Sequence, residues 1–232
     1  MERGFGKLRL AALNIDGVLL NDTFSPVIHH FVVSRGGTYT AETERAIFSQ
    51  PQHIAGLGMA AATGSTMTGE EALAAYFEER DRHVARHPVE VADGAVELLH
   101  RLRGLGLRTV CYGGLSKDHF DRFLGDHADL FDGPGYVCTN DIRPGIHEIT
   151  TQVFGLKHDQ AVFVDDVARV AETARTLGTP FIGLPSPFEH GFQRQLMAEA
   201  GVRHLIGRLA DIDEGLLRRL DAEAEAGTVW ER

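Results

Sequence analysis

The chain has 232 residues, of which 24% are charged and 43% hydrophobic, and its formal net charge is −10 at pH 7. This length and composition are typical of a globular protein that buries a full core. The acidic balance argues against nucleic acid as the main partner, because phosphate backbones are held by basic faces. The two cysteines form neither a disulfide framework nor a zinc-ligand spacing. With no signal peptide and no apolar run of membrane-spanning length, we expect a cytoplasmic protein without membrane contact.

Short apolar runs with strand character alternate with helical patterns along most of the chain. Strands are expected at residues 8–14, 107–112, 136–139, 161–164 and 179–184, with a short addition at 204–206. Helices are expected at residues 94–103, 116–124, 146–154, 168–177 and 188–200 and from residue 211, and the charged tail from residue 222 is expected to fray. Alternation of this kind predicts an α/β fold, with a parallel sheet covered by helices on both faces.

The segment between the first two strands is helical in its patterning. Helices are expected at residues 25–35, 40–48 and 69–87, on either side of a Gly/Ala-rich middle at 56–68. A link of this length is too long for a simple crossover. We therefore interpret it as a small helical lid over the carboxyl end of the first strand. The predicted domains are an α/β core of residues 1–20 and 92–232 and a helical cap of residues 21–91.

Residues able to carry chemistry follow four of the expected strands. They are Asn14 and Asp16 in the stretch NIDGV, Gly113 and Gly114 after LRTVCY, Arg143 before Pro144, and Asp165 and Asp166 after VFV. In open α/β sheets, ligands bind outside the carboxyl ends of the strands. The sequence therefore predicts that these residues converge on one crevice.

The order of these motifs resembles that of the haloacid dehalogenase-like (HAD) superfamily over nearly the whole chain. That superfamily has Asp-x-Asp-Gly-(Thr/Val) after the first strand, Ser or Thr after the second, Lys-Pro before a helix, and an acidic pair or Gly-Asp after the fourth. Leu130-Phe131-Asp132 also matches the Phe-Asp that usually precedes the third strand. The resemblance implies a Rossmann-like doubly wound sheet with a C1-type helical cap. It also implies Mg²⁺-dependent hydrolysis of a small phosphorylated metabolite.

The resemblance also implies a role for each matched position. In the superfamily a carboxylate attacks phosphorus, a metal neutralises the phosphoryl oxygens, and a second carboxyl group protonates the leaving oxygen. Asn14 stands at the position of the attacking group, and Asp16 at that of the general acid and base. Arg143 takes the place of the catalytic lysine. The implied phosphate site is Gly113 and Gly114, and the implied metal ligands are Asn14, Asp16, Asp165 and Asp166.

Three of these positions depart from the pattern. Asn14 is an amide, which is a very poor nucleophile and a neutral ligand, so weakened Mg²⁺ binding is expected. Gly113 removes the hydroxyl that usually binds phosphate, although backbone N–H groups before a helix still favour an anion. Arg143 is bulkier than lysine but holds anions in bidentate fashion. Three departures together favour natural divergence over a single engineered change at residue 14.

Each of these positions also has a purely structural interpretation. Asn14, Asp16 and Gly113 are also typical turn residues, Arg143 could be a solvated surface residue, and Asp166 could cap the helix that follows it. The motifs favour an enzyme that hydrolyses phosphoric monoesters and takes a small anionic substrate. The alternatives are another reaction on the same fold, such as elimination or a different hydrolysis, or a binding or regulatory protein without turnover. Substrate identity and oligomeric state stay open. Lid contacts to the substrate are expected from His29, His30, Arg35 and His53.

Overall fold

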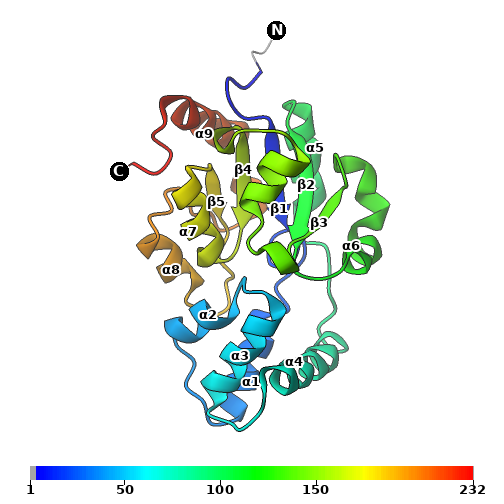
Figure 1. Cartoon of the computed structure of the whole chain (residues 1–232). Coiled ribbons are helices and arrows are strands. Elements are labelled where there is room, and N and C mark those ends of the chain that lie inside the picture. Colours follow the sequence, from blue (N-terminus) through cyan, green and yellow to red (C-terminus); the bar gives the residue numbers. More distant parts are fainter. Residues whose placement is uncertain (1–3, 232) are drawn as a thin grey trace.

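The computed structural model describes residues 4–231 and shows a parallel β-sheet with helices on both faces (Figure 1). The strands within these residues are β1 (Leu10–Asn14), β2 (Arg108–Gly113), β3 (Tyr136–Cys138), β4 (Ala161–Asp165) and β5 (Phe181–Gly183). Their order is β3-β2-β1-β4-β5, and all neighbours are parallel. The predicted α/β fold is confirmed. The expected strand at 204–206 is reduced to one bridge between Gly183 and Leu205.

β1 is buried on both faces because each face carries its own layer of helices. Leu10 and Ala12 belong to one hydrophobic cluster, and Ala11 and Leu13 to the other. The first cluster includes residues of α7 (Ala168–Leu177) and α8 (Gln193–Glu199), and the second includes residues of α5 (Ala95–Gly104), α6 (Lys117–Leu124) and α9 (Glu214–Ala226). A strand covered on both sides reads as a continuous apolar run, which is why the sequence of β1 lacks polar alternation.

A helical insert follows β1, as predicted, and lies at one end of the sheet, in blue to blue-green in Figure 1. Its helices are α1 (Ser25–Ser34), α2 (Ala41–Ile47), α3 (Gln52–Thr63) and α4 (Gly69–Val84), called the cap helices below. The Gly/Ala-rich middle lies in the helix α3 as far as Thr63, and residues 64–68 form the link to α4. A Cβ atom at Gly56 would lie 2.3 Å from the carbonyl oxygen of Gly69, so glycine allows α3 to approach the start of α4.

The two connections between the cap helices and the sheet run side by side. Leu20 pairs with Val91 in an antiparallel bridge, and the amide of Asn21 donates to the carbonyl of Glu90 at 3.0 Å. The amide of Ala92 donates back to Leu19 at 2.9 Å. The insert therefore leaves and rejoins the sheet at nearly the same point. The exact bounds of 21–91 stay a prediction.

Several expected elements differ in the structure. The helix expected at 188–200 begins only at Gln193, and the one expected at 146–154 is a short π-helix, η3 (Glu148–Val153). The expectation that the tail frays is wrong, because the Trp230 indole N–H donates to the Thr179 carbonyl at 3.0 Å and Val229 is buried. None of the helices in residues 4–231 combines the length and apolar character that a membrane crossing requires.

Candidate active site

A pocket lies between the carboxyl ends of the strands and the cap helices, with an empty volume of about 820 Å³, part of it open to solvent. On the sheet side it is lined by Asn14, Asp16, Gly114, Arg143, Asp165 and Asp166. Six of the seven residues singled out in the sequence thus line one pocket. The seventh, Gly113, is buried directly behind it. The arrangement follows from the parallel sheet, whose carboxyl ends meet at one edge.

Asn14 is held between two oxygen atoms. Its Nδ2 donates to the backbone carbonyl of Asp16 at 2.8 Å and to Oδ1 of Asp166 at 3.0 Å. The close approach of Asp166 requires glycine at position 17, where φ is 83° and a Cβ atom would lie 2.3 Å from Oδ2 of Asp166. The positive end of the Asn14 amide therefore points at the two oxygens that the HAD resemblance assigns to a metal.

Asp165 and Asp166 form a buried acidic pair. Burial raises the pKa of Asp165 to about 6, although its carboxylate accepts hydrogen bonds from the Tyr112 hydroxyl at 2.5 Å and the Val167 amide at 2.8 Å. Burial, and then the neighbouring charge of Asp165, raise the pKa of Asp166 well above its usual range. Two buried carboxylates resist ionising together unless a cation or a proton compensates them.

Asp166 does not cap the helix that follows it. The residue at the N-cap of α7 is Val167, and the first free amide of the helix, that of Ala168, donates instead to Oε1 of Gln193 at 2.7 Å. The side chain of Asp166 thus lines the pocket and contacts Asn14, and it does not bind the free amides of α7.

His119 is a site residue that the sequence reasoning missed. Its Nε2 lies 2.9 Å from Oδ1 of Asp16, and the two side chains are only 10% and 14% exposed. His119 stands in the first turn of α6, just after β2, and side chains on a helix lean toward its N-terminus. The one signal in the sequence that could have indicated His119 is its position in the first turn of the helix that begins after Ser116, close to the end of the second strand. Ser116 itself is exposed and does not line the pocket.

Arg143 lies against Gly114. A Cβ atom at Gly114 would be 2.1 Å from a guanidinium nitrogen of Arg143, so the glycine makes room for the larger cation. The NH1 group of Arg143 donates to the Ser49 hydroxyl at 3.4 Å, and its Nε finds no partner among the described residues. Arg143 is also the only Lys or Arg among the described residues that line the pocket.

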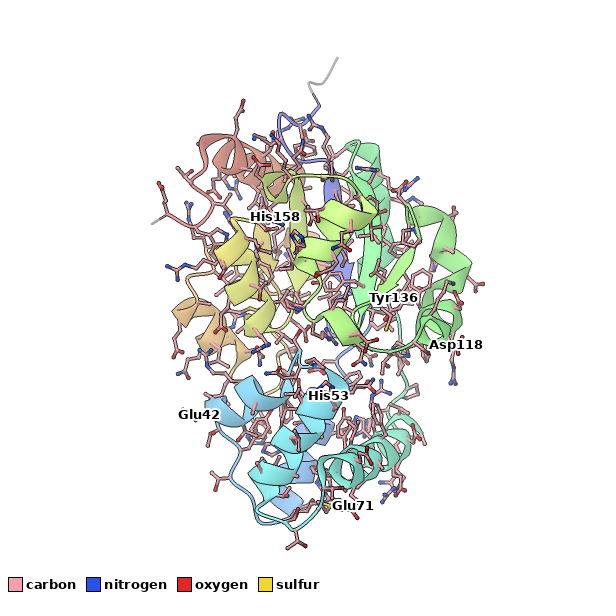
Figure 2. The ribbon with its side chains drawn as sticks, in the orientation of Figure 1. Glu42, His53, Glu71, Asp118, Tyr136 and His158 are labelled. Carbon is pink, nitrogen blue, oxygen red and sulfur yellow. The ribbon has the colours of Figure 1, made fainter. Side chains whose placement is uncertain are left out.

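Gly113 fits the same pattern of mutual adjustment. A Cβ atom at this position would lie 2.4 Å from Cγ2 of Ile15, a fully buried side chain. The space that a serine or threonine would need is therefore filled by the residue that directly follows β1. Tyr136, labelled in Figure 2, fixes the loop after β2 by donating its hydroxyl to the Leu115 carbonyl at 2.7 Å. The departures at residues 113 and 143 are thus accommodated by their neighbours Ile15 and Gly114.

The basic residues expected to contact a substrate from the lid do not line the pocket among the residues described. His29 stacks on His190 at 4.4 Å between ring centroids, and Arg35 pairs with Glu79 at 2.6 Å. His53 is exposed near the start of α3 (Figure 2). Arg35 therefore links the end of α1 to α4, and His29 links α1 to the loop before α8.

Oxygen atoms suited to Mg²⁺ are present, but in a changed arrangement. The carboxylate of Asp166 and the backbone carbonyl of Asp16 are ligands of the type that Mg²⁺ prefers. The N–H₂ of Asn14 faces both, so an ion fits only if the amide turns and presents its oxygen. Within residues 4–231, no group of three or more His, Cys, Asp or Glu side chains is arranged to hold a metal.

Comparison with known proteins identifies the fold. No protein-family model and no curated protein matches the sequence. Among solved structures, a haloacid dehalogenase-like protein of unknown function from Agrobacterium tumefaciens matches with a TM-score of 0.66 and 20% identity, over 91% of this chain and 99% of that one. A HAD hydrolase of family IA, variant 3, from Entamoeba histolytica matches with a TM-score of 0.67 and 12% identity, over 93% and 100%. A HAD family hydrolase from Deinococcus radiodurans, solved with phosphate and sodium, matches with a TM-score of 0.60 and 18% identity, over 94% and 97%. The chain has the HAD-like fold, with a helical insert of the C1 type after its first strand.

Proposed function

We propose that the protein hydrolyses a small phosphoric monoester in the pocket between the sheet and the cap helices. The catalytic carboxylate is that of Asp16, because residue 14 is an amide. The observation that carries this proposal is the partly buried pairing of Asp16 with His119, beside a pocket in which Arg143 is the only Lys or Arg among the described lining residues. Further support comes from the similar structure of the Deinococcus hydrolase, which was solved with phosphate.

In this scheme, Arg143 and the backbone N–H groups near Gly114 hold the phosphoryl oxygens. The oxygen of a water molecule attacks phosphorus while Asp16 accepts its proton. The bond between phosphorus and the ester oxygen breaks, and Asp16 returns the proton to that oxygen, which releases the alcohol and phosphate. General acid–base catalysis of this kind contributes about 10²–10⁴-fold. His119 keeps the carboxylate of Asp16 in place.

We propose Mg²⁺ as the cofactor, held by Asp166, the backbone carbonyl of Asp16 and the turned amide oxygen of Asn14, with Asp165 acting through water. When bound, the ion would neutralise phosphoryl charge and the charge of the acidic pair. Because one ligand is a neutral amide, weaker binding is expected than at a site with an additional carboxylate.

The test is phosphate release from a panel of small monoesters, with and without Mg²⁺, by the intact chain and by Asp16→Asn. We expect measurable turnover that falls about 10²–10⁴-fold in the variant. Arg143→Gln should raise KM, because the variant loses the cation facing the phosphoryl group. Full activity in Asp16→Asn would contradict the assignment.

A second candidate is a binding protein without turnover. It is favoured by one observation, the engagement of the Asn14 amide with Asp16 and Asp166, which leaves no attacking carboxylate at that position. Saturable binding of inorganic phosphate with no hydrolysis of any monoester would support this candidate over the first.

A further inference from the structure

The cap side of the pocket is an apolar chamber. It is lined by Phe24, Ile28, Phe48, Met59, Leu73 and Phe77. Phe24 directly precedes α1 and Phe48 directly follows α2, and the others belong to α1, α3 and α4. The polar strand ends line the same pocket. A ligand whose anionic group lies at Arg143 therefore directs the rest of its body into apolar surroundings.

The polar side chains at the rim of this chamber are already engaged. The amide side chain of Gln52 donates to the Gly114 carbonyl at 3.3 Å, and its backbone amide donates to Oδ1 of Asn140 at 3.0 Å. Gln50 donates to the Arg45 carbonyl at 3.2 Å. The bonds of Gln52 join the start of α3 to the loops after the strands, whereas that of Gln50 stays within the cap. The amide donors of both side chains are therefore occupied and offer little to the hydroxyl groups of a polyol.

Two residues that line the chamber each have a buried polar atom without a partner among the described residues. The hydroxyl of Tyr76 is buried in a side chain only 2% exposed, and Oδ2 of Asp22 is buried while its Oδ1 accepts from the amides of Phe24 and Ser25. A buried hydroxyl without a partner costs about 1–3 kcal/mol. Because both atoms are buried, they add no polar surface to the chamber.

We propose that the ligand is a small anion carried on an apolar body of about the size of one ring. The anionic end rests on the proposed function, while the apolar body rests on the chamber. A sugar phosphate is disfavoured, because burial of its hydroxyl groups would leave them without partners.

The chamber can be tested by calorimetric titration of the intact protein with phenylphosphonate, methylphosphonate and glucose 1-phosphate. Burial of a ring gains roughly 25 cal/mol per Å² of apolar area, so we expect phenylphosphonate to bind at least about tenfold more tightly than methylphosphonate. Glucose 1-phosphate should bind no more tightly than methylphosphonate. Equal binding of the two phosphonates, or tighter binding of the sugar phosphate, would overturn the apolar body and leave the anion site standing. Failure of all three to bind would overturn both.

A variant of the chamber separates its contribution from that of the anion site. Phe77 is only partly buried, so Phe77→Ala removes ring contacts at modest cost to the fold. It should weaken phenylphosphonate binding about five- to tenfold and leave methylphosphonate unchanged, and Phe77→Leu should recover part of the loss. Leu57→Ala is the matched control, because Leu57 is 57% exposed on α3 and lies outside the pocket. Unchanged affinity for phenylphosphonate in Phe77→Ala would contradict the proposal.

Discussion

Asn14 donates its amide protons to two oxygens that would otherwise face each other without a donor. In Asn14→Asp, a third acceptor would stand beside the carbonyl of Asp16 and the carboxylate of Asp166. Loss of these bonds inside a buried site costs about 1–3 kcal/mol, and each kcal/mol corresponds to roughly 2–4 °C in a chain of this size. We expect a lower Tm in EDTA and a larger rise in Tm on adding Mg²⁺ than the wild type shows. Thermal denaturation with and without Mg²⁺ measures both.

Asn21→Asp is the control for this prediction. Nδ2 of Asn21 donates to the Pro88 carbonyl at 3.0 Å in the connection to the cap helices, outside the pocket. Its loss should lower the Tm without any rescue by Mg²⁺. Equal stability of Asn14→Asp and wild type in EDTA would show that the amide does not hold the two oxygens apart.

Tyr76 offers a second test at the residue scale. Because its buried hydroxyl has no partner among the described residues, Tyr76→Phe removes an unsatisfied group and keeps the ring contacts with Phe24 and Phe77. The free energy of unfolding without ligand should stay unchanged or rise by about 1 kcal/mol. Urea denaturation measures it. A fall of more than about 1 kcal/mol would mean that the hydroxyl is bonded in the free protein.

Among the elements, α2 is joined to the start of α8 by one buried carboxylate. Glu44 is 0% exposed and accepts from the Tyr39 hydroxyl at 2.8 Å, the Phe192 amide at 2.9 Å and Nε2 of Gln193 at 2.8 Å. The amide of Gln193 is oriented by Ala168, which donates to its Oε1. In Glu44→Gln, a second N–H₂ would therefore face a donor, and we expect a loss of about 1–3 kcal/mol, measured by urea denaturation. Glu42→Gln on the outer face of α2 (Figure 2) is the matched control and should change little.

The parts of the fold that the sequence predicts are those governed by local pattern. β1 and β4 were predictable because they are apolar runs bounded by polar residues. The lid was predictable because its helical pattern is too long for a simple crossover. The start of α8 was not, because Phe192 is held by Glu44, a residue 148 positions away. The pairing of His119 with Asp16 depends likewise on how α6 packs on the sheet through Phe120. Long-range contacts of this kind leave no periodic signal.

At the scale of the whole molecule, the contact between the cap helices and the rest of the chain contains two titratable groups, Glu44 and His29. Their contributions to stability change with pH in opposite directions. Burial raises the pKa of Glu44 above 4.5, so folding holds its proton more tightly than the unfolded chain does. Its contribution to stability is fully present below about pH 4.5 and is lost as the pH rises through the folded pKa. His29, stacked on His190, has a pKa lowered from 6.5 by burial and then by the charges of His190 and His30, while Glu189 opposes the shift. Its contribution is present above about pH 6.5 and is lost as the pH falls.

Single variants should separate the pH dependence that His29 gives to the Tm from that given by Glu44. In His190→Gln the like charge facing His29 is absent, so the advantage in Tm of wild type over this variant should shrink as the pH falls from about 7 to 5. In Glu44→Gln the opposite holds, and the advantage of wild type should shrink as the pH rises from about 4.5 through the raised pKa of Glu44, because only the wild type then carries a buried charge. Thermal denaturation at a series of pH values, at constant ionic strength, measures both differences. If both groups act as described, the Tm of the double variant should depend less on pH than that of either single variant. Parallel pH profiles for the wild type and both single variants would mean that neither group makes the contact between the cap helices and the rest of the chain depend on pH.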